Sequence, residues 1–158
     1  MSNKYAEEIK RLIIQTGKQI QDMEEDRLTS KPAPNKWSKI EILGHLIDSA
    51  YNNHQRFLRA WDTDDLIFAG YDQEAWVHKN NYQKRDVKEV IQMFIAVNNH
   101  IANLINQLDE ELLNKTTTNH NFHKIGMRPI AKGSPTNLAY LIDDYIYHMK
   151  HHLKQILE

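Results

Sequence analysis

Four long stretches of this sequence repeat apolar residues every three or four positions, which is the spacing that lines one face of an α-helix. They predict helices over residues 3–25, 38–61, 86–108 and 136–158. No segment shows the strict alternation of apolar and polar residues that is typical of a half-buried strand. Four amphipathic helices must bury their apolar faces against one another, so we expect an all-α four-helix bundle.

Local signals mark where these helices begin. Ser38 and Glu41 have the spacing of a capping box, in which each side chain bonds a free backbone amide at a helix start. Asp86 and Glu89 repeat this spacing before the third helix. Thr136 is the expected N-cap of the last helix, which follows a polar stretch of the chain.

Two connections between the predicted helices are long. Residues 62–85 include the segment 71–76, where we expect a short helical turn around Trp76. Residues 114–135 are polar and read as a loop or a short hairpin. Connections of this length are typical of functional segments and suit crossovers better than a simple up-and-down chain. We expect a single domain over residues 1–158.

The composition excludes several classes of partner. The net charge of −1 gives no electrostatic reason to expect nucleic acid or an anionic membrane. No apolar run approaches the roughly 20 residues of a membrane span, and the first residues lack the apolar core of a signal peptide. We therefore expect a cytoplasmic protein.

Cysteine is absent, whereas histidine occurs nine times. Without cysteine there is no thiolate ligand and no cysteine nucleophile. A metal would have to be held by imidazole, carboxylate, water or backbone. The histidines are therefore the side chains to follow.

Two histidines of the last helix point toward the predicted core. His148 and His152 are four residues apart and so lie on one face of the helix, beside its apolar residues. A helical wheel places His151 on the polar side, with Asp144 and Tyr147. An inward pair of this kind can hold a metal, but hydrogen-bonded core histidines are a more common explanation.

The second helix carries a polar stripe of His45, Ser49, Asn52 and Arg56. Such a stripe can face water, or it can line a cavity that opens at one end of the bundle. Arg56 could extend along the surface, or it could hold an anionic group of a substrate, since a guanidinium binds carboxylates with two parallel hydrogen bonds.

A site that combines these helices requires one particular packing. His45 is near the start of its helix, whereas His148 and His152 are near the end of theirs. The three residues can meet only if the two helices run antiparallel. Three histidines with open positions form a typical catalytic zinc site, and imidazole also suits nickel, iron and copper.

Several of these residues belong to motifs that resemble a known family. Residues 35–38 (NKWS) lead into 44–49 (GHLIDS), followed by 71–76 (YDQEAW) and 148–152 (HMKHH). In this order they resemble the DinB superfamily, and most closely its YfiT branch of metal-dependent hydrolases. The resemblance covers nearly the whole chain. Residues 119–125 depart from the family pattern, so no role is transferred to them.

The resemblance implies a four-helix bundle with a metal bound by His45, His148 and His152. Zinc and nickel are both associated with the branch, iron is compatible with the ligands, and homodimers are common. Related members include transferases of low-molecular-weight thiols such as bacillithiol or mycothiol, and thiol-dependent isomerases. The expected enzyme would activate either water, as a hydrolase, or a thiol, as an S-transferase, for attack on a small electrophile.

The remaining expectations concern the loops and a second class of function. Asp72 and Trp76 either anchor their loop or, with Ser49, Asn52 and Arg56, contact the substrate. His120 and His123 are expected to be exposed. The alternative function is a non-catalytic bundle that associates through its helices and whose histidines are structural.

Overall fold

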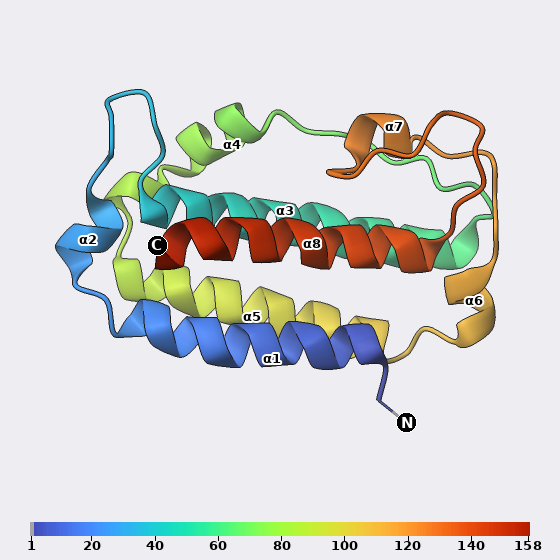
Figure 1. The fold of residues 1–158 in the computed structure, drawn as a ribbon, viewed down its shortest axis with the longest axis horizontal. Helices are drawn as coiled ribbons and strands as arrows, with labels where there is room; N and C mark the ends of the chain where they lie inside the picture. Colours follow the sequence, from blue (N-terminus) through green and yellow to red (C-terminus); the bar gives the residue numbers. More distant parts are fainter. Residues whose placement is uncertain (1) are drawn as a thin grey trace.

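The computed structural model describes residues 2–158 and has the expected all-α architecture (Figure 1). Four long helices form the bundle: α1 (Lys4–Gln21), α3 (Lys39–Arg59), α5 (Val87–Ile105) and α8 (Leu138–Leu157). The connections contain α2 (Glu25–Thr29), η1 (Ala60–Asp62), α4 (Gln73–Asn80), η2 (Tyr82–Lys84), α6 (Glu110–Asn114) and α7 (Phe122–Ile125). Within the described part of the chain, β-structure is limited to isolated bridges.

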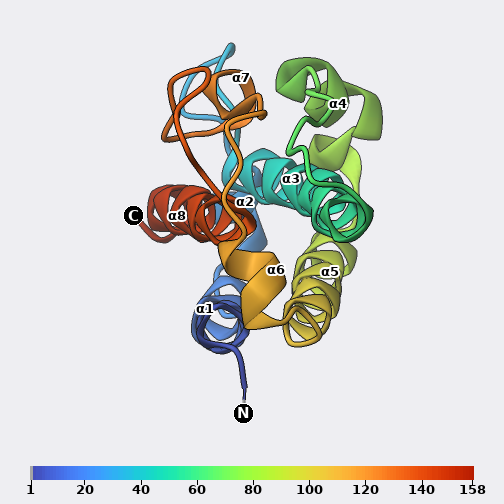
Figure 2. The ribbon, with the colours of Figure 1, turned by 90° about the vertical axis from the view of Figure 1, so that its right-hand side faces the viewer.

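The order of the helices is not a simple up-and-down series. The connection between α3 and α5 runs back along the length of the bundle and carries α4, so α3 and α5 are parallel (Figure 1). α8 runs antiparallel to α3, beside it, which brings its last turns next to the first turns of α3. Seen along the bundle, α4 lies over α3 and α7 lies over α8 (Figure 2). These short helices and the residues beside them, 70–80 and 122–128, cover one side of the bundle, and we call them the roof.

The core is continuous and mostly aliphatic. α1 and α5 face each other through fully buried side chains such as Ile9, Ile20, Phe94 and Ile101. This burial supplies most of the favourable free energy of folding, at about 25 cal/mol for each Å² of apolar surface removed from water. α3 and α8 contribute apolar residues to the same core, but they also carry polar side chains into it.

Most of the predicted helix starts are correct. Ser38 and Glu41 form the complete capping box, and Asp86 accepts a hydrogen bond from the amide of Glu89. The prediction that Thr136 caps the last helix is wrong. Asn137 caps it, through its side-chain oxygen and the amide of Tyr140.

Other differences lie at the helix ends and in the second long connection. The first helix ends at Gln21, and Trp61, the last residue of the predicted second helix, lies beyond the end of α3 and is half exposed. The segment predicted as a loop or hairpin contains α7 and a single antiparallel bridge between Thr117 and Thr136. This bridge takes up Thr136, which explains why the cap is the next residue.

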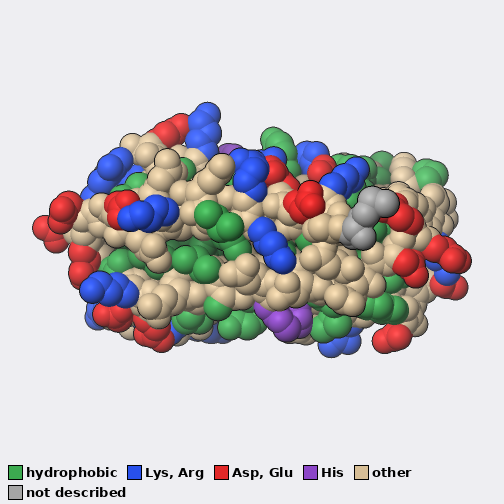
Figure 3. Space-filling view, turned by 90° about the horizontal axis from the view of Figure 1, so that it is seen from below, with side chains coloured by type: hydrophobic (Ala, Val, Ile, Leu, Met, Phe, Trp, Pro, Cys, Tyr) green, Lys and Arg blue, Asp and Glu red, His purple; other side chains and the backbone are tan. Residues whose placement is uncertain are grey.

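The surface opposite the roof shows no concentration of one charge. Acidic and basic side chains are interspersed over this face, with hydrophobic side chains between them (Figure 3). Among residues 2–158, none of the helices combines the length and the apolar character that a membrane span requires.

Candidate metal centre and its cavity

His45, His148 and His152 meet at the end of the bundle where α3 begins and α8 ends. One potential ligand atom from each of them lies within 4.8 Å of the others. The two closest atoms, Nε2 of His45 and Nε2 of His148, are 3.0 Å apart. The antiparallel packing of these two helices, which the sequence required for such a cluster, is therefore present.

The outer nitrogens of two of these rings have partners. Nδ1 of His152 is 2.7 Å from Oε1 of Gln155, and because an amide oxygen only accepts, this nitrogen must donate. Nε2 of His152 is then left with a free lone pair. Nδ1 of His148 lies 3.5 Å from Oγ of Ser49. Contacts of this kind fix the tautomer and the orientation of metal-binding histidines.

Burial keeps the three imidazoles neutral. It lowers the pKa of His45 to about 4, with a further contribution from His152. It lowers the pKa of His148 to about 3, together with the neighbouring histidines, and it also lowers the pKa of His152. Neutral imidazole is the form that binds metals. Nδ1 of His45 is buried and has no hydrogen-bond partner within residues 2–158.

A tight approach of η2 to α3 positions the helix that carries His45. Gly44 faces the ring of Tyr82, and a Cβ atom at this glycine would lie only 2.1 Å from a ring carbon. Glycine is therefore required here for steric reasons. The hydroxyl of Tyr82 donates to Oδ1 of Asp48, one turn further along α3. The ring of Trp37 packs beside that of His45, with the two ring centroids 5.1 Å apart.

The histidines lie in the wall of a cavity of about 430 Å³ between α3, α8 and the roof. α3 contributes His45, Ser49, Asn53 and Arg56 to its wall. The roof contributes residues 70–71 and 73, before and at the start of α4, and residues 124–127, at the end of α7. From α8 come Leu141, Asp144, Tyr145, His148, His151 and His152.

Two of the predicted substrate contacts on α3 line this cavity and one does not. Ser49 and Arg56 are in its wall, as expected. Asn52 is not, and its amide instead donates to the carbonyl of Asp48. The residue in the cavity is Asn53, which the sequence analysis did not select. It is one turn from Ser49, so a spacing of four residues was the signal available for it.

The structure also places Asp72 and Trp76 outside the cavity wall, which corrects their assignment as substrate contacts and favours the alternative that they anchor their loop. The side chain of Asp72 caps α4 by accepting from the amide of Ala75. The ring of Trp76 packs against Tyr71, with centroids 4.8 Å apart. Gln73 of this motif lines the cavity, and so does Tyr71. Burial raises its pKa to about 12, so it remains protonated and can donate a hydrogen bond.

The other histidines have separate roles. His151 is exposed, as predicted, although its ring borders the mouth of the cavity. His120 was expected to be exposed and is buried, because Nε2 bonds the carbonyl of Ser134 and Nδ1 accepts from the amide of Phe122. His123, expected to be exposed as well, is partly buried.

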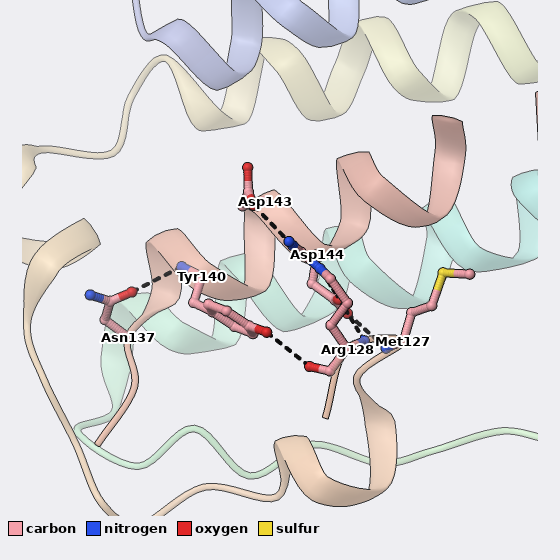
Figure 4. Close-up of polar contacts among 6 residues, drawn as sticks. All are labelled: Met127, Arg128, Asn137, Tyr140, Asp143 and Asp144. Carbon is pink, nitrogen blue, oxygen red and sulfur yellow. Dashed lines mark hydrogen bonds and ion pairs between the residues drawn. The ribbon is translucent and has the colours of Figure 1, made fainter. Parts of the chain in front are cut away.

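Asp144 fastens the roof to α8 (Figure 4). Its carboxylate accepts from the backbone amides of Met127 and Arg128, at 2.8 and 2.9 Å, and from Nε of Arg128. Arg128 also pairs with Asp143, while its carbonyl accepts from the hydroxyl of Tyr140. The helical wheel placed Asp144 on the polar side, and this is wrong because the roof buries it. Its position four residues before His148 was the signal for a place in the wall.

Comparisons with known proteins agree with this architecture. A family model described as the DinB superfamily matches residues 15–156. A relative from Bacillus mycoides is 25% identical over 98% of this chain and 82% of its own length. A relative from Bacillus cereus is 26% identical over 99% of this chain and 83% of its own length. Each is named "Putative metal-dependent hydrolase". The solved structure of YfiT from Bacillus subtilis, described as a probable metal-dependent hydrolase with an unusual four-helix bundle topology, superposes with a TM-score of 0.76 at 16% identity, covering 97% of this chain and 82% of that one.

Proposed function

This chain belongs to the DinB superfamily, and from that membership we propose that it is an enzyme that depends on a divalent metal held by His45, His148 and His152. The observation that carries the proposal is the convergence of three neutral imidazoles in the wall of one cavity. The names of the Bacillus relatives support it. Zinc and nickel both suit three imidazole ligands, and iron is compatible with them.

A divalent ion at three imidazoles supplies a Lewis acid that polarises a carbonyl group and lowers the pKa of a coordinated water or thiol. The protein supplies the rest of the site. Ser49 and Gln155 hold the rings of His148 and His152, respectively. Tyr71, protonated at neutral pH, can donate a hydrogen bond to a substrate in the cavity.

The cavity wall offers neither a cysteine nor a free carboxylate as a covalent nucleophile. The chain has no cysteine, and the one carboxylate in the wall, that of Asp144, is occupied by Arg128 and two backbone amides. We propose that the attacking group comes from outside the protein. With water the enzyme is a hydrolase, and with a low-molecular-weight thiol of the bacillithiol type it is an S-transferase.

Parallel assays on the metal-loaded protein test this function and distinguish its two forms. One follows the hydrolysis of a chromogenic ester, and the other follows the conjugation of bacillithiol to 1-chloro-2,4-dinitrobenzene. We expect at least one activity to require the metal, to be lost in His148→Ala and to persist in His78→Ala, a control histidine that is exposed and outside the cavity wall. Activity that survives both metal removal and His148→Ala would contradict the proposal.

We propose a cytoplasmic enzyme that forms a homodimer and acts on a small molecule rather than on nucleic acid or a membrane. The mixed charge of the face in Figure 3 is consistent with the absence of a polyanionic partner there. Light scattering on the purified protein measures the oligomeric state directly, and a monomeric mass would overturn the dimer.

A further inference from the structure

Arg56 lies in the same cavity wall as the three histidines but far along α3 from them. His45 and Arg56 are eleven residues apart in one helix, which is about 16 Å along its axis at 1.5 Å per residue. The side chain of Arg56 extends toward the start of α3, where its Nη1 lies 3.4 Å from Oδ1 of Asn53. The guanidinium and the imidazoles are then on the order of 10 Å apart.

The charge of Arg56 is not neutralised by the protein. The side chain is only 7% exposed, and within residues 2–158 no carboxylate lies within ion-pair distance of it. Two of its N–H groups donate, to the carbonyl of Ala69 and to the side chain of Asn53, while Nε has no partner. A guanidinium has five N–H groups, so donors remain for another molecule.

A buried charge without a partner is costly for a protein to keep. Burial also lowers the pKa of Arg56, but a guanidinium stays charged at neutral pH. The one carboxylate in the cavity wall, that of Asp144, is satisfied by Arg128 and two amides. Lys124 also lines the wall but is exposed, so Arg56 is the buried ionic group of the wall that a ligand can neutralise.

On α3, the wall between the two ends is polar. Ser49 and Asn53 follow His45 at intervals of four residues, on the side of α3 that faces the cavity. Because α8 is antiparallel, its own cavity residues run from His152, beside His45, back to Leu141, toward the Arg56 end. The cavity is thus an elongated trough with the candidate metal centre at one end and a guanidinium at the other.

We infer that the substrate is an elongated organic molecule with a carboxylate that binds Arg56, on the order of 10 Å from the bond that reacts at the three histidines. This inference rests on the proposed function and names its substrate class. A single planar guanidinium matches the two oxygens of a carboxylate, whereas phosphate sites are commonly built from several donors, including clusters of backbone amides.

Hydroxamates test the inference by measuring binding rather than activity. Monohydroxamates of linear dicarboxylic acids have a metal-binding group at one end and a carboxylate at the other. Each is compared with the alkyl hydroxamate of the same length by calorimetry on the zinc-loaded protein. At the chain length that spans the trough, the carboxylate should strengthen binding roughly tenfold to a hundredfold. Shorter compounds should gain little.

Substitution identifies the group that recognises the carboxylate. Arg56→Gln should remove the preference and leave the affinity for the alkyl hydroxamate unchanged, because the metal end of the cavity is untouched. Arg56→Lys, which keeps the charge, should restore part of it. Arg59→Gln is the matched control, since Arg59 is exposed on the same helix and outside this cavity.

The outcomes separate the two proposals. Equal affinity for the paired hydroxamates at every chain length would overturn the inference, and this result needs no variant to fold. A preference that persists in a folded Arg56→Gln protein would overturn it as well. If the alkyl hydroxamates fail to bind the zinc-loaded protein at all, the proposed function fails first, and the inference fails with it.

Discussion

The two pairs of helices in this bundle bury very different side chains. α1 and α5 meet through aliphatic and aromatic residues, and Thr16 and Asn98 are their only buried polar side chains in the described chain. α3 and α8 bury a set of polar and charged groups against the same core. Among those on α3, His45, Asp48 and Arg56 each have a buried side-chain atom without a hydrogen-bond partner within residues 2–158.

Within one core, the α1–α5 pair therefore contributes mainly to stability, whereas the α3–α8 pair carries the candidate site. Unsatisfied buried polar groups cost free energy, so a helix pair selected for stability alone would replace them with apolar residues. Two of the three on α3, His45 and Arg56, lie in the cavity wall, where their free atoms are available to a ligand. The α1–α5 pair supplies the packing that compensates for this cost.

The largest effect on stability is expected for a substitution between α1 and α5. Phe94 is fully buried there, and Phe94→Ala should reduce the free energy of unfolding by about 3–5 kcal/mol, through lost apolar burial and the cavity that remains. Zinc affinity of the folded protein should not change. Urea denaturation measures the first quantity and calorimetry the second. Ile14→Ala, at an exposed position of α1, is the control and should stay within about 0.5 kcal/mol.

A smaller effect on the α3–α8 side should show the opposite pattern. Gln155→Ala removes the partner of Nδ1 of His152 and should weaken zinc binding about tenfold, the lower end of the range for such partners, because Gln155 is exposed. Stability of the metal-free protein should be nearly unchanged. Zinc affinity equal to that of the wild type would show that this contact does not orient the ring.

A dependence on pH should also distinguish the two sides. Burial raises the pKa of Asp48, so the folded protein holds this proton more tightly than the unfolded chain does. The stabilisation is present in acid and is lost as the pH rises through the raised pKa. Asp48→Asn cannot lose a proton, so its stability relative to the wild type should increase with pH. Denaturation at a series of pH values measures this, and a constant difference would contradict it.

The smallest effect concerns an ion pair that joins the two sides. Glu8 on α1 contacts Arg11 and also Lys150 on α8, and these contacts lower its pKa to about 2. Glu8→Gln should cost about 0.2–1 kcal/mol at neutral pH, since water screens the pair. The stabilisation should be lost as the pH falls from about 4.5 to about 2. Glu7→Gln, next to it and exposed, is the control at neutral pH and should stay within about 0.5 kcal/mol.

The parts that followed from the sequence are those that local periodicity determines. The long helices, the inward face of His148 and His152, and the outward face of His151 all depend on the position of a side chain around its own helix axis. The cluster with His45 needed one further condition, antiparallel packing of two helices, which the sequence could state and the structure fulfils.

The parts that did not follow depend on what lies beside or above a helix. A helical wheel shows only the side chains of α8 itself. It could not show that residues 124–127 cover this helix, so Asp144 was assigned to the polar side. The stripe on α3 could not show on which side α8 packs, and this decides between Asn52 and Asn53. His120 was misplaced for the same reason, because its partner in the second connection, Ser134, is fourteen residues away.

The most direct test of the account is a calorimetric titration of zinc into the metal-free protein. We expect the wild type and His151→Ala each to bind one ion per chain with similar affinity, because His151 lies outside the cluster. His148→Ala should bind at least a hundredfold more weakly, which exceeds the cost of losing a mere partner of a ligand. Wild-type affinity in a folded His148→Ala protein, or an equal loss in His151→Ala, would contradict the three-histidine site.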